Sequence, residues 1–188
     1  VPSSDCVVEV PVASTMCKTG NAEVAGTVAE VNLISPTSIE LKITADEDIA
    51  FLPGQYVNIQ VPGSEETRAY SFSSPPGSRD LSFLIRNVPG GLMSSWLVGE
   101  ARTGDKVTLT GPMGVFYLRP VQRPVLMLAG GTGLAPFLAM LESLKEKGCD
   151  QPTHMIYGVT NDDDLVGLEA LEKFAEEIEN LSFKTVVA

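Results

Sequence analysis

Arg68 and Tyr70, an arginine and a tyrosine separated by one residue, could together hold a phosphorylated planar cofactor. They lie in Arg-Ala-Tyr-Ser-Phe-Ser, residues 68–73, a run of strand-forming residues that ends before Pro75 and Pro76. Strand alternation places both side chains on one face. A guanidinium pairs with phosphate oxygens, and the neighbouring ring offers a stacking surface. The competing interpretation is an ordinary strand with an exposed arginine, and so short a motif does not decide between the two.

A second segment could bind an anion. An apolar strand over 125–129 leads into Gly130-Gly131-Thr132-Gly133, and an amphipathic helix is predicted over 134–147. Backbone N–H groups and a helix N-terminus then face one point, which favours an anion there. Pro136 stands where the dinucleotide fingerprint has its third glycine, so this is not the standard Rossmann motif. Proline in the first helical turn loses no internal hydrogen bond.

Two further segments have both a structural and a functional interpretation. Gly90 and Gly91 precede a short helical stretch with Ser94 in its first turn, which is either a plain turn or a second nest of free N–H groups. Asp162, Asp163 and Asp164 follow a strand predicted over 153–159. They either cap a helix over 165–179 or lie at a strand end where a nucleotide ribose can bind.

The elements that must position these residues divide the chain in two. Residues 22–119 contain six short strands separated by Pro, Gly and Asp, which predicts a six-stranded antiparallel β-barrel. The strands are expected over 24–33, 38–44, 55–61, 68–73, 81–86 and 106–110. Residues 120–188 follow a β-α-β-α-β order, with the last strand over 181–187, which predicts part of a doubly wound parallel sheet. Residues 1–21 do not begin like a domain and contain a linker.

Composition excludes some classes of partner. The formal net charge of −11 over 188 residues disfavours nucleic acid and anionic membrane surfaces. No apolar run reaches the ~20 residues of a membrane span, and the first residues lack a signal peptide, so we expect a cytoplasmic protein. Cys6, Cys17 and Cys149 have no C-x-x-C spacing, and His154 is the only histidine, so no metal site is predicted.

The motifs Arg68-x-Tyr70-Ser71 and Gly130-Gly-Thr-Gly133-x-x-Pro136 resemble the flavin and nicotinamide motifs of the ferredoxin-NADP reductase superfamily. A closer similarity, carried by residues 86–91 and 121–133, is to reductase components of benzoate- and anthranilate-type ring-hydroxylating dioxygenases. This resemblance implies that residues 1–21 are the tail of a ferredoxin domain and its linker. It also implies that the chain is a fragment without the [2Fe-2S] cluster motif and without the C-terminal end of the family's nucleotide domain.

The resemblance implies roles for individual residues. Tyr70 would stack on the flavin, Arg68 would meet its phosphates, and Ser71 would hydrogen-bond near N5, the atom that receives hydride. Thr132 would face the nicotinamide, so Ser71 and Thr132 are the expected catalytic residues. The remaining expected cofactor contacts are Arg86, Asn87, Val88, Gly91, Leu92, Met93, Ser94, Gly130, Gly131, Gly133 and Asp162. Since strand alternation separates Tyr70 from Ser71, how both reach the flavin is not explained by the sequence.

The function implied is electron transfer from NADH through FAD to a [2Fe-2S] centre and on to an aromatic-ring-hydroxylating dioxygenase. A flavin is needed because nicotinamide delivers electrons as hydride whereas iron-sulfur centres accept them singly. The expected cofactors are FAD and NADH, with the [2Fe-2S] cluster only in the absent N-terminal domain, and the expected partner is the terminal oxygenase. The aspartates at 162–164 favour NADH over NADPH. Two alternatives stay open: a monooxygenase reductase, and a flavin- or nucleotide-binding module without turnover.

Overall fold

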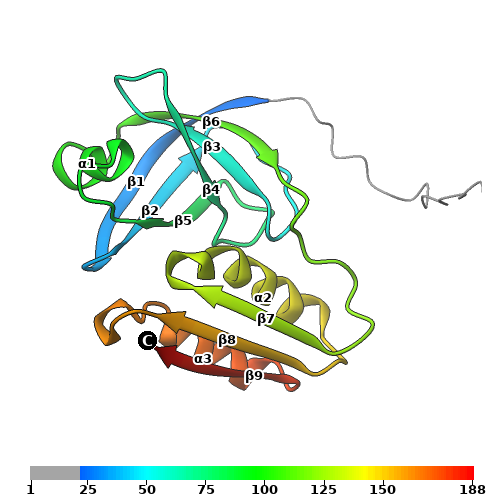
Figure 1. Cartoon of the computed structure of the whole chain (residues 1–188). Coiled ribbons are helices and arrows are strands. Elements are labelled where there is room, and N and C mark those ends of the chain that lie inside the picture. The colour runs from blue at the N-terminus through cyan, green and yellow to red at the C-terminus, as the bar shows by residue number, and fades with distance from the viewer. Residues whose placement is uncertain (1–21) are drawn as a thin grey trace, which may run out of the picture.

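The computed structural model describes residues 22–188, which form a barrel and, below it, a smaller sheet with helices on one face (Figure 1). The interpretation of residues 1–21 as a ferredoxin tail and linker lies outside the described residues. An antiparallel sheet spans residues 23–113, and a parallel sheet spans residues 125–187. Both parts of the predicted fold class are confirmed.

Six strands build the antiparallel sheet, in the order β4-β3-β6-β1-β2-β5. Their bounds are β1 Glu23–Ser35, β2 Ser38–Ala45, β3 Tyr56–Gln60, β4 Thr67–Ser71, β5 Asp80–Arg86 and β6 Lys106–Met113. The alternate residues Leu41 and Ile43 of β2, like Val57 and Ile59 of β3, are fully buried in the barrel core. Helix α1, Leu92–Gly99, follows β5 and packs Trp96 and Leu97 onto this core.

The barrel closes at only one end of its seam. The outermost strands β4 and β5 meet through a bridge between Phe72 and Phe83 and through the Ser73 N–H, which donates to the Ser82 carbonyl at 2.8 Å. Beyond this point the two strands are not paired, so β4 has a free edge from Thr67 to Ser71. This open part of the seam faces the second sheet.

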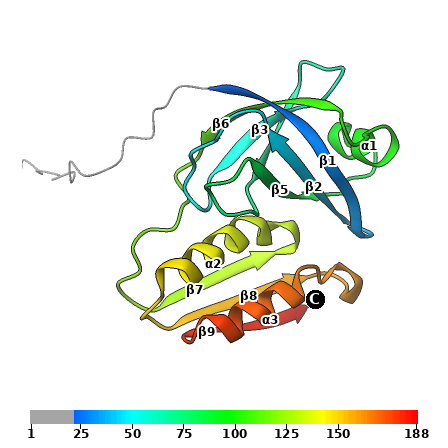
Figure 2. The ribbon, with the colours of Figure 1, turned by 180° about the vertical axis from the view of Figure 1, so that it is seen from behind.

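Three parallel strands build the second sheet, in the order β7-β8-β9. The elements are β7 Val125–Gly130, a 3₁₀ turn η1 Gly131–Leu134, α2 Ala135–Lys147, β8 Thr153–Val159, a 3₁₀ turn η2 Asp162–Asp164, α3 Leu168–Glu177 and β9 Leu181–Val187. Figures 1 and 2 show both helices on the same face of the sheet, with α2 next to the barrel. Both helices lie on one face because each connects two neighbouring parallel strands by a right-handed crossover. On the opposite face Leu126 and Leu128 are 60% and 62% exposed.

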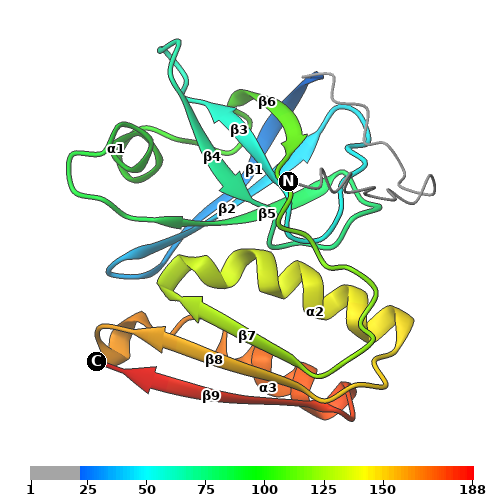
Figure 3. The ribbon, with the colours of Figure 1, turned by 45° about the vertical axis from the view of Figure 1, so that its right-hand side comes forward.

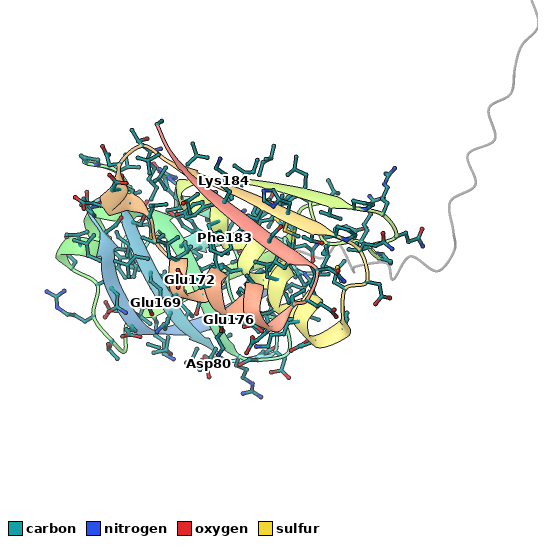
Figure 4. All side chains as sticks on the ribbon, turned by 90° about the horizontal axis from the view of Figure 1, so that it is seen from below. Asp80, Glu169, Glu172, Glu176, Phe183 and Lys184 are labelled. Atoms are coloured by element: carbon teal, nitrogen blue, oxygen red, sulfur yellow. The ribbon has the colours of Figure 1, made fainter. Side chains whose placement is uncertain are left out.

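Helix α3 starts later than the sequence predicts. A helix was expected over 165–179, but α3 begins at Leu168, and its N-cap is Gly167 in the left-handed conformation (φ 73°). The aspartates therefore form η2 and do not cap α3. Leu171 and Phe174 of α3 are buried, whereas Glu169, Glu172 and Glu176 lie along its exposed side, as Figure 4 shows from below.

Side chains from both sheets hold the two parts together. Leu84 of β5 is buried in the core of the second sheet, beside residues of α2 and η1. Gly54, with φ of 108°, lies so close to Met140 of α2 and to the Phe116 carbonyl that an added Cβ would overlap both. Figure 3 shows the connection after β6 running along the outside to β7, so these packing contacts set how the sheets lie.

Candidate functional site

The open seam of the barrel contains a cavity of about 490 Å³, which we call the β4–β5 cavity. Residues of β4, β5, α1 and the glycine turn line it, and this brings together most of the predicted flavin contacts. The lining comprises Arg68, Ala69, Tyr70, Ser71, Leu84, Arg86, Val88, Gly91, Leu92, Met93, Ser94, Thr132, Gly133, Ala135 and Pro136. Its volume is in the range of small-molecule and cofactor sites.

The free edge of β4 explains how Tyr70 and Ser71 can meet one ligand. They point to opposite faces of the strand, yet both line the β4–β5 cavity because no neighbouring strand covers this edge. Tyr70 also packs against the barrel core, and desolvation there raises the pKa of its phenol to about 12, although the nearby Arg68 opposes the shift. The Tyr70 ring therefore stays neutral at physiological pH.

Arg68 contacts two residues that precede it directly in the chain. Its Nη2 pairs with a Glu66 carboxylate oxygen at 2.6 Å, and its Nη1 donates to the Thr67 carbonyl at 2.9 Å. The side chains of Arg68 and Glu66 are 44% and 60% exposed, and an ion pair so exposed stabilises a protein little. The guanidinium can exchange Glu66 for a phosphate at little cost.

The N-terminus of α1 supplies donors on the other side of the cavity. Gly91 is the N-cap, and no side chain caps the helix. The first-turn amides of Leu92, Met93 and Ser94 therefore have no acceptor within the helix, as an anion site requires. The Ser94 hydroxyl donates to the Arg86 carbonyl (3.1 Å) and accepts from the Val88 N–H (3.0 Å), so it closes the loop around this site.

Asn87 differs from the prediction, because it lines neither this cavity nor the next one described. Its backbone N–H donates to the Thr37 carbonyl at 2.8 Å, and its side-chain amide donates to the Pro36 carbonyl at 3.2 Å. Asn87 thus contacts the turn between β1 and β2 through both groups. Sequence reasoning does not predict these contacts, because the turn lies far away in the chain.

A second cavity, of about 480 Å³, lies where the three parallel strands end, and we call it the strand-end cavity. Open parallel sheets bind ligands at this position. The predicted residues Gly130, Gly131 and Thr132 line it. Arg86 and Asp164, which the sequence analysis also named, line it as well. Sequence reasoning missed the other lining residues, which are Thr37, Ser38, Gly158, Val159, Thr160, Asn161, Val186 and Ala188. Asp162 and Asp163 instead line a shallow groove beside Thr160 and Val187.

The glycine turn keeps space that the protein itself does not fill. An added Cβ at Gly130, Gly131 or Gly133 would meet no atom within 4 Å, and of the three only Gly131 has a positive φ, of 50°. Gly130 has φ of −128°, which any residue can adopt. Neither packing nor backbone conformation therefore requires glycine at 130. Glycine at 130 leaves the backbone accessible, as close approach of a ligand requires.

The two cavities meet at Thr132 and Arg86, the residues that line both. Thr132 comes from the glycine turn, and Arg86 comes from the end of β5. Because each cavity has anion-binding groups of its own, the arrangement can hold two phosphorylated ligands with their other ends at this junction. Within residues 22–188 no cluster of His, Cys, Asp and Glu is suited to a metal ion, and none of the helices there has the length and apolar character needed to cross a membrane.

The barrel has an open seam with a helix N-terminus beside it, and a glycine turn follows the first strand of the parallel sheet. This combination is typical of flavin- and nucleotide-binding oxidoreductases. Comparison with known families agrees. Residues 26–117 match the oxidoreductase FAD-binding domain, and residues 127–188 match the oxidoreductase NAD-binding domain. The chain belongs to the ferredoxin-NADP reductase family, in which these two domains follow one another.

Two curated relatives and one solved structure show which kinds of protein the chain is similar to. The toluate 1,2-dioxygenase electron transfer component of Pseudomonas putida is 55% identical over 187 residues, which is 98% of this chain and 56% of that protein. The 2-halobenzoate 1,2-dioxygenase electron transfer component of Burkholderia cepacia is 43% identical over 188 residues, again 98% and 56%. The crystal structure of the Amycolatopsis cytochrome P450 reductase GcoB is 32% identical with a TM-score of 0.83, covering 88% of this chain and 52% of that one. The chain thus spans about half the length of these relatives.

Proposed function

We propose that the protein passes electrons from NADH through FAD to a [2Fe-2S] centre and on to an aromatic-ring-hydroxylating dioxygenase. The observation that carries the proposal is the meeting of the β4–β5 cavity and the strand-end cavity at Thr132 and Arg86. Two redox cofactors bound with their reactive ends at one junction can exchange hydride directly. The relatives that are electron transfer components of dioxygenases support the direction of the electron flow.

In this proposal the β4–β5 cavity holds FAD. Tyr70 provides a neutral stacking surface, Arg68 pairs with the phosphates after releasing Glu66, and the amides of Leu92 and Met93 bind the diphosphate. Ser71 has a hydroxyl at the free edge of β4, where it can hydrogen-bond the flavin ring. The bound flavin supplies the conversion between hydride and single electrons.

The strand-end cavity holds NADH in the same proposal. Gly130 and Gly131 let the pyrophosphate approach the backbone, and Thr132 directs the nicotinamide toward the flavin. Asp162, in the groove beside Thr160, accepts a hydrogen bond from the adenosine ribose.

The proposal extends to domains and partners. Residues 22–119 form the flavin-binding domain, residues 120–188 form the first part of the nucleotide-binding domain, and residues 1–21 connect to a ferredoxin domain. The terminal oxygenase receives the electrons, and because NADH is formed by metabolism in the cytoplasm, the protein acts there.

Anaerobic mixing with NADH tests the proposal. The flavin-loaded full-length protein should lose its visible flavin absorbance, and adding the terminal oxygenase with oxygen and an aromatic acid should restore it and form a cis-dihydrodiol. If the reduced flavin supports only monohydroxylation, the partner is a monooxygenase and not a dioxygenase. If excess NADH does not reduce the flavin, the protein is a flavin- or nucleotide-binding module without turnover.

A further inference from the structure

Asp164 is a buried carboxylate that connects the two domains. Only 7% of the residue is exposed, although Asp162 and Asp163 beside it are exposed. One of its oxygens accepts from the hydroxyls of Thr37 (2.5 Å) and Ser35 (3.3 Å), which belong to the barrel. The other oxygen accepts from Asn161 Nδ2 at 3.2 Å. We call Ser35, Thr37, Asn161 and Asp164 the bridging cluster.

The charge of Asp164 matches these donors. The Thr37 hydroxyl, followed by Asn161, lowers the pKa of the Asp164 carboxyl, so it is ionised at neutral pH. A buried carboxylate is costly unless its oxygens accept hydrogen bonds, and bonds to a charged acceptor are the stronger ones. These hydrogen bonds therefore stabilise the packing of the turn between β1 and β2 against the end of β8, because moving the turn away would leave the buried Asp164 carboxylate with fewer donors.

The barrel side of the cluster leads on to the flavin-binding loop. The Thr37 carbonyl accepts the Asn87 N–H at 2.8 Å, and Asn87 holds the Pro36 carbonyl through its side chain. The next residue, Val88, donates to the Ser94 hydroxyl at the start of α1. A continuous set of hydrogen bonds thus runs from the strand-end cavity to the diphosphate-binding amides of the β4–β5 cavity.

The nucleotide side of the cluster is equally well fixed. The Asp164 carbonyl accepts the Val166 N–H at 2.9 Å and lies 3.4 Å from the hydroxyl of Tyr157, which is fully buried in β8. Asp164 therefore moves with β8 and the glycine turn beside it, whereas Ser35 and Thr37 move with the barrel. No strand pairing joins the two sheets among the described residues, which leaves side-chain contacts such as this one to set their relative position.

We propose that Asp164 is a positioning residue, which through Ser35 and Thr37 aligns the nucleotide-binding strand ends with the flavin-binding loop. The inference rests on the proposed function, because alignment matters only if the two bound rings must react. Its loss should lower the rate of hydride transfer and leave flavin binding intact, since Asp164 does not line the β4–β5 cavity. Small misplacements of reacting groups cost up to about 100-fold in rate, and we expect about tenfold here.

The kinetic experiment uses flavin-loaded full-length protein with Asp164→Asn, Thr37→Val and the double variant. Asp150→Asn is the matched control, because it makes the same change at an exposed position outside the bridging cluster and outside both cavities. Each single variant should keep its flavin content and lose about tenfold in flavin reduction at saturating NADH, and the double variant should lose no more than the single ones. Losses that multiply, or an equal loss in Asp150→Asn, would overturn the proposal.

Hydrogen exchange tests the same cluster without turnover, so the inference and the proposed function can fail separately. In Asp164→Asn, the amides of residues 37–38, 86–88 and 90–94 should exchange faster than in the wild type, and in Asp150→Asn they should not. Unchanged exchange in Asp164→Asn would overturn the inference even if NADH reduces the flavin. If these amides exchange faster in Asp164→Asn but NADH does not reduce the flavin of the wild type, the bridging contact is supported and the proposed function is rejected.

Discussion

NADH should be preferred to NADPH because of the charges at the ribose end of the nucleotide site. Asp162 and Asp163 line the groove with Thr160, Asn161, Val187 and Ala188, so this groove has carboxylates and no lysine or arginine in its lining. Both aspartates are exposed, which calls for an effective dielectric constant of about 40 to 80. A dianionic 2′-phosphate about 8 Å from one carboxylate then meets a repulsion of about 1 to 2 kcal/mol, or roughly five- to thirty-fold in affinity.

The assay compares kcat/KM for NADH and NADPH on the full-length protein. Thr160→Arg combined with Asp162→Ser replaces a repulsive charge by an attractive one and should reduce the preference for NADH by about tenfold or more. Asp150→Ser is the control, because it removes the same charge from an exposed position before β8, at the other end of the strand. A wild type that uses NADPH equally well, or an Asp150→Ser variant with the same shift, would refute the reasoning.

Three other variants test the site and its surroundings. Arg68→Ala should weaken flavin retention more than Tyr70→Phe does, because it removes a phosphate partner; equal flavin-to-protein ratios would contradict this role. Gly130→Val should leave the melting temperature unchanged, since φ of −128° suits valine and no atom lies within 4 Å of the added Cβ, yet it should abolish NAD⁺ binding in calorimetry; unchanged binding would remove the pyrophosphate from this turn. Burial raises the pKa of Tyr70 from 10.0 to about 12, so the stability linked to its neutral phenol is present below pH 10 and lost as pH rises toward 12. Urea unfolding between these pH values should show a smaller loss for Tyr70→Phe, and an identical loss would argue against the burial of this ring.

Local patterns in the sequence were sufficient to predict the strands and the glycine turns before two helices. Strand-forming runs between Pro and Gly predict all nine strands of the described residues, and the glycines predict the turn at Gly91 before α1 and the glycine turn before α2. These features depend on residues close in the chain. The start of α3 was wrong by three residues because Gly167 takes a left-handed conformation, and an added Cβ there would lie 3.1 Å from Leu134, a residue distant in the chain.

The parts of the site that the sequence did not predict depend on where strands end in space. Tyr70 and Ser71 reach one cavity because β4 is an unpaired edge, and strand order cannot be read from alternation. Thr37 occupies an ordinary hairpin turn, and its contact with Asp164 joins residues 127 positions apart. Asp164 looked equivalent to Asp162 in the sequence, yet it is the one that is buried.

A structure of the full-length protein crystallised with FAD and NAD⁺ tests the central claim most directly. The account predicts the flavin ring in the β4–β5 cavity against Tyr70, with the nicotinamide ring about 3 to 3.5 Å from it at the junction formed by Thr132 and Arg86. A flavin bound outside the open seam of the barrel, or a fully occupied dinucleotide whose nicotinamide cannot approach this junction, would contradict it.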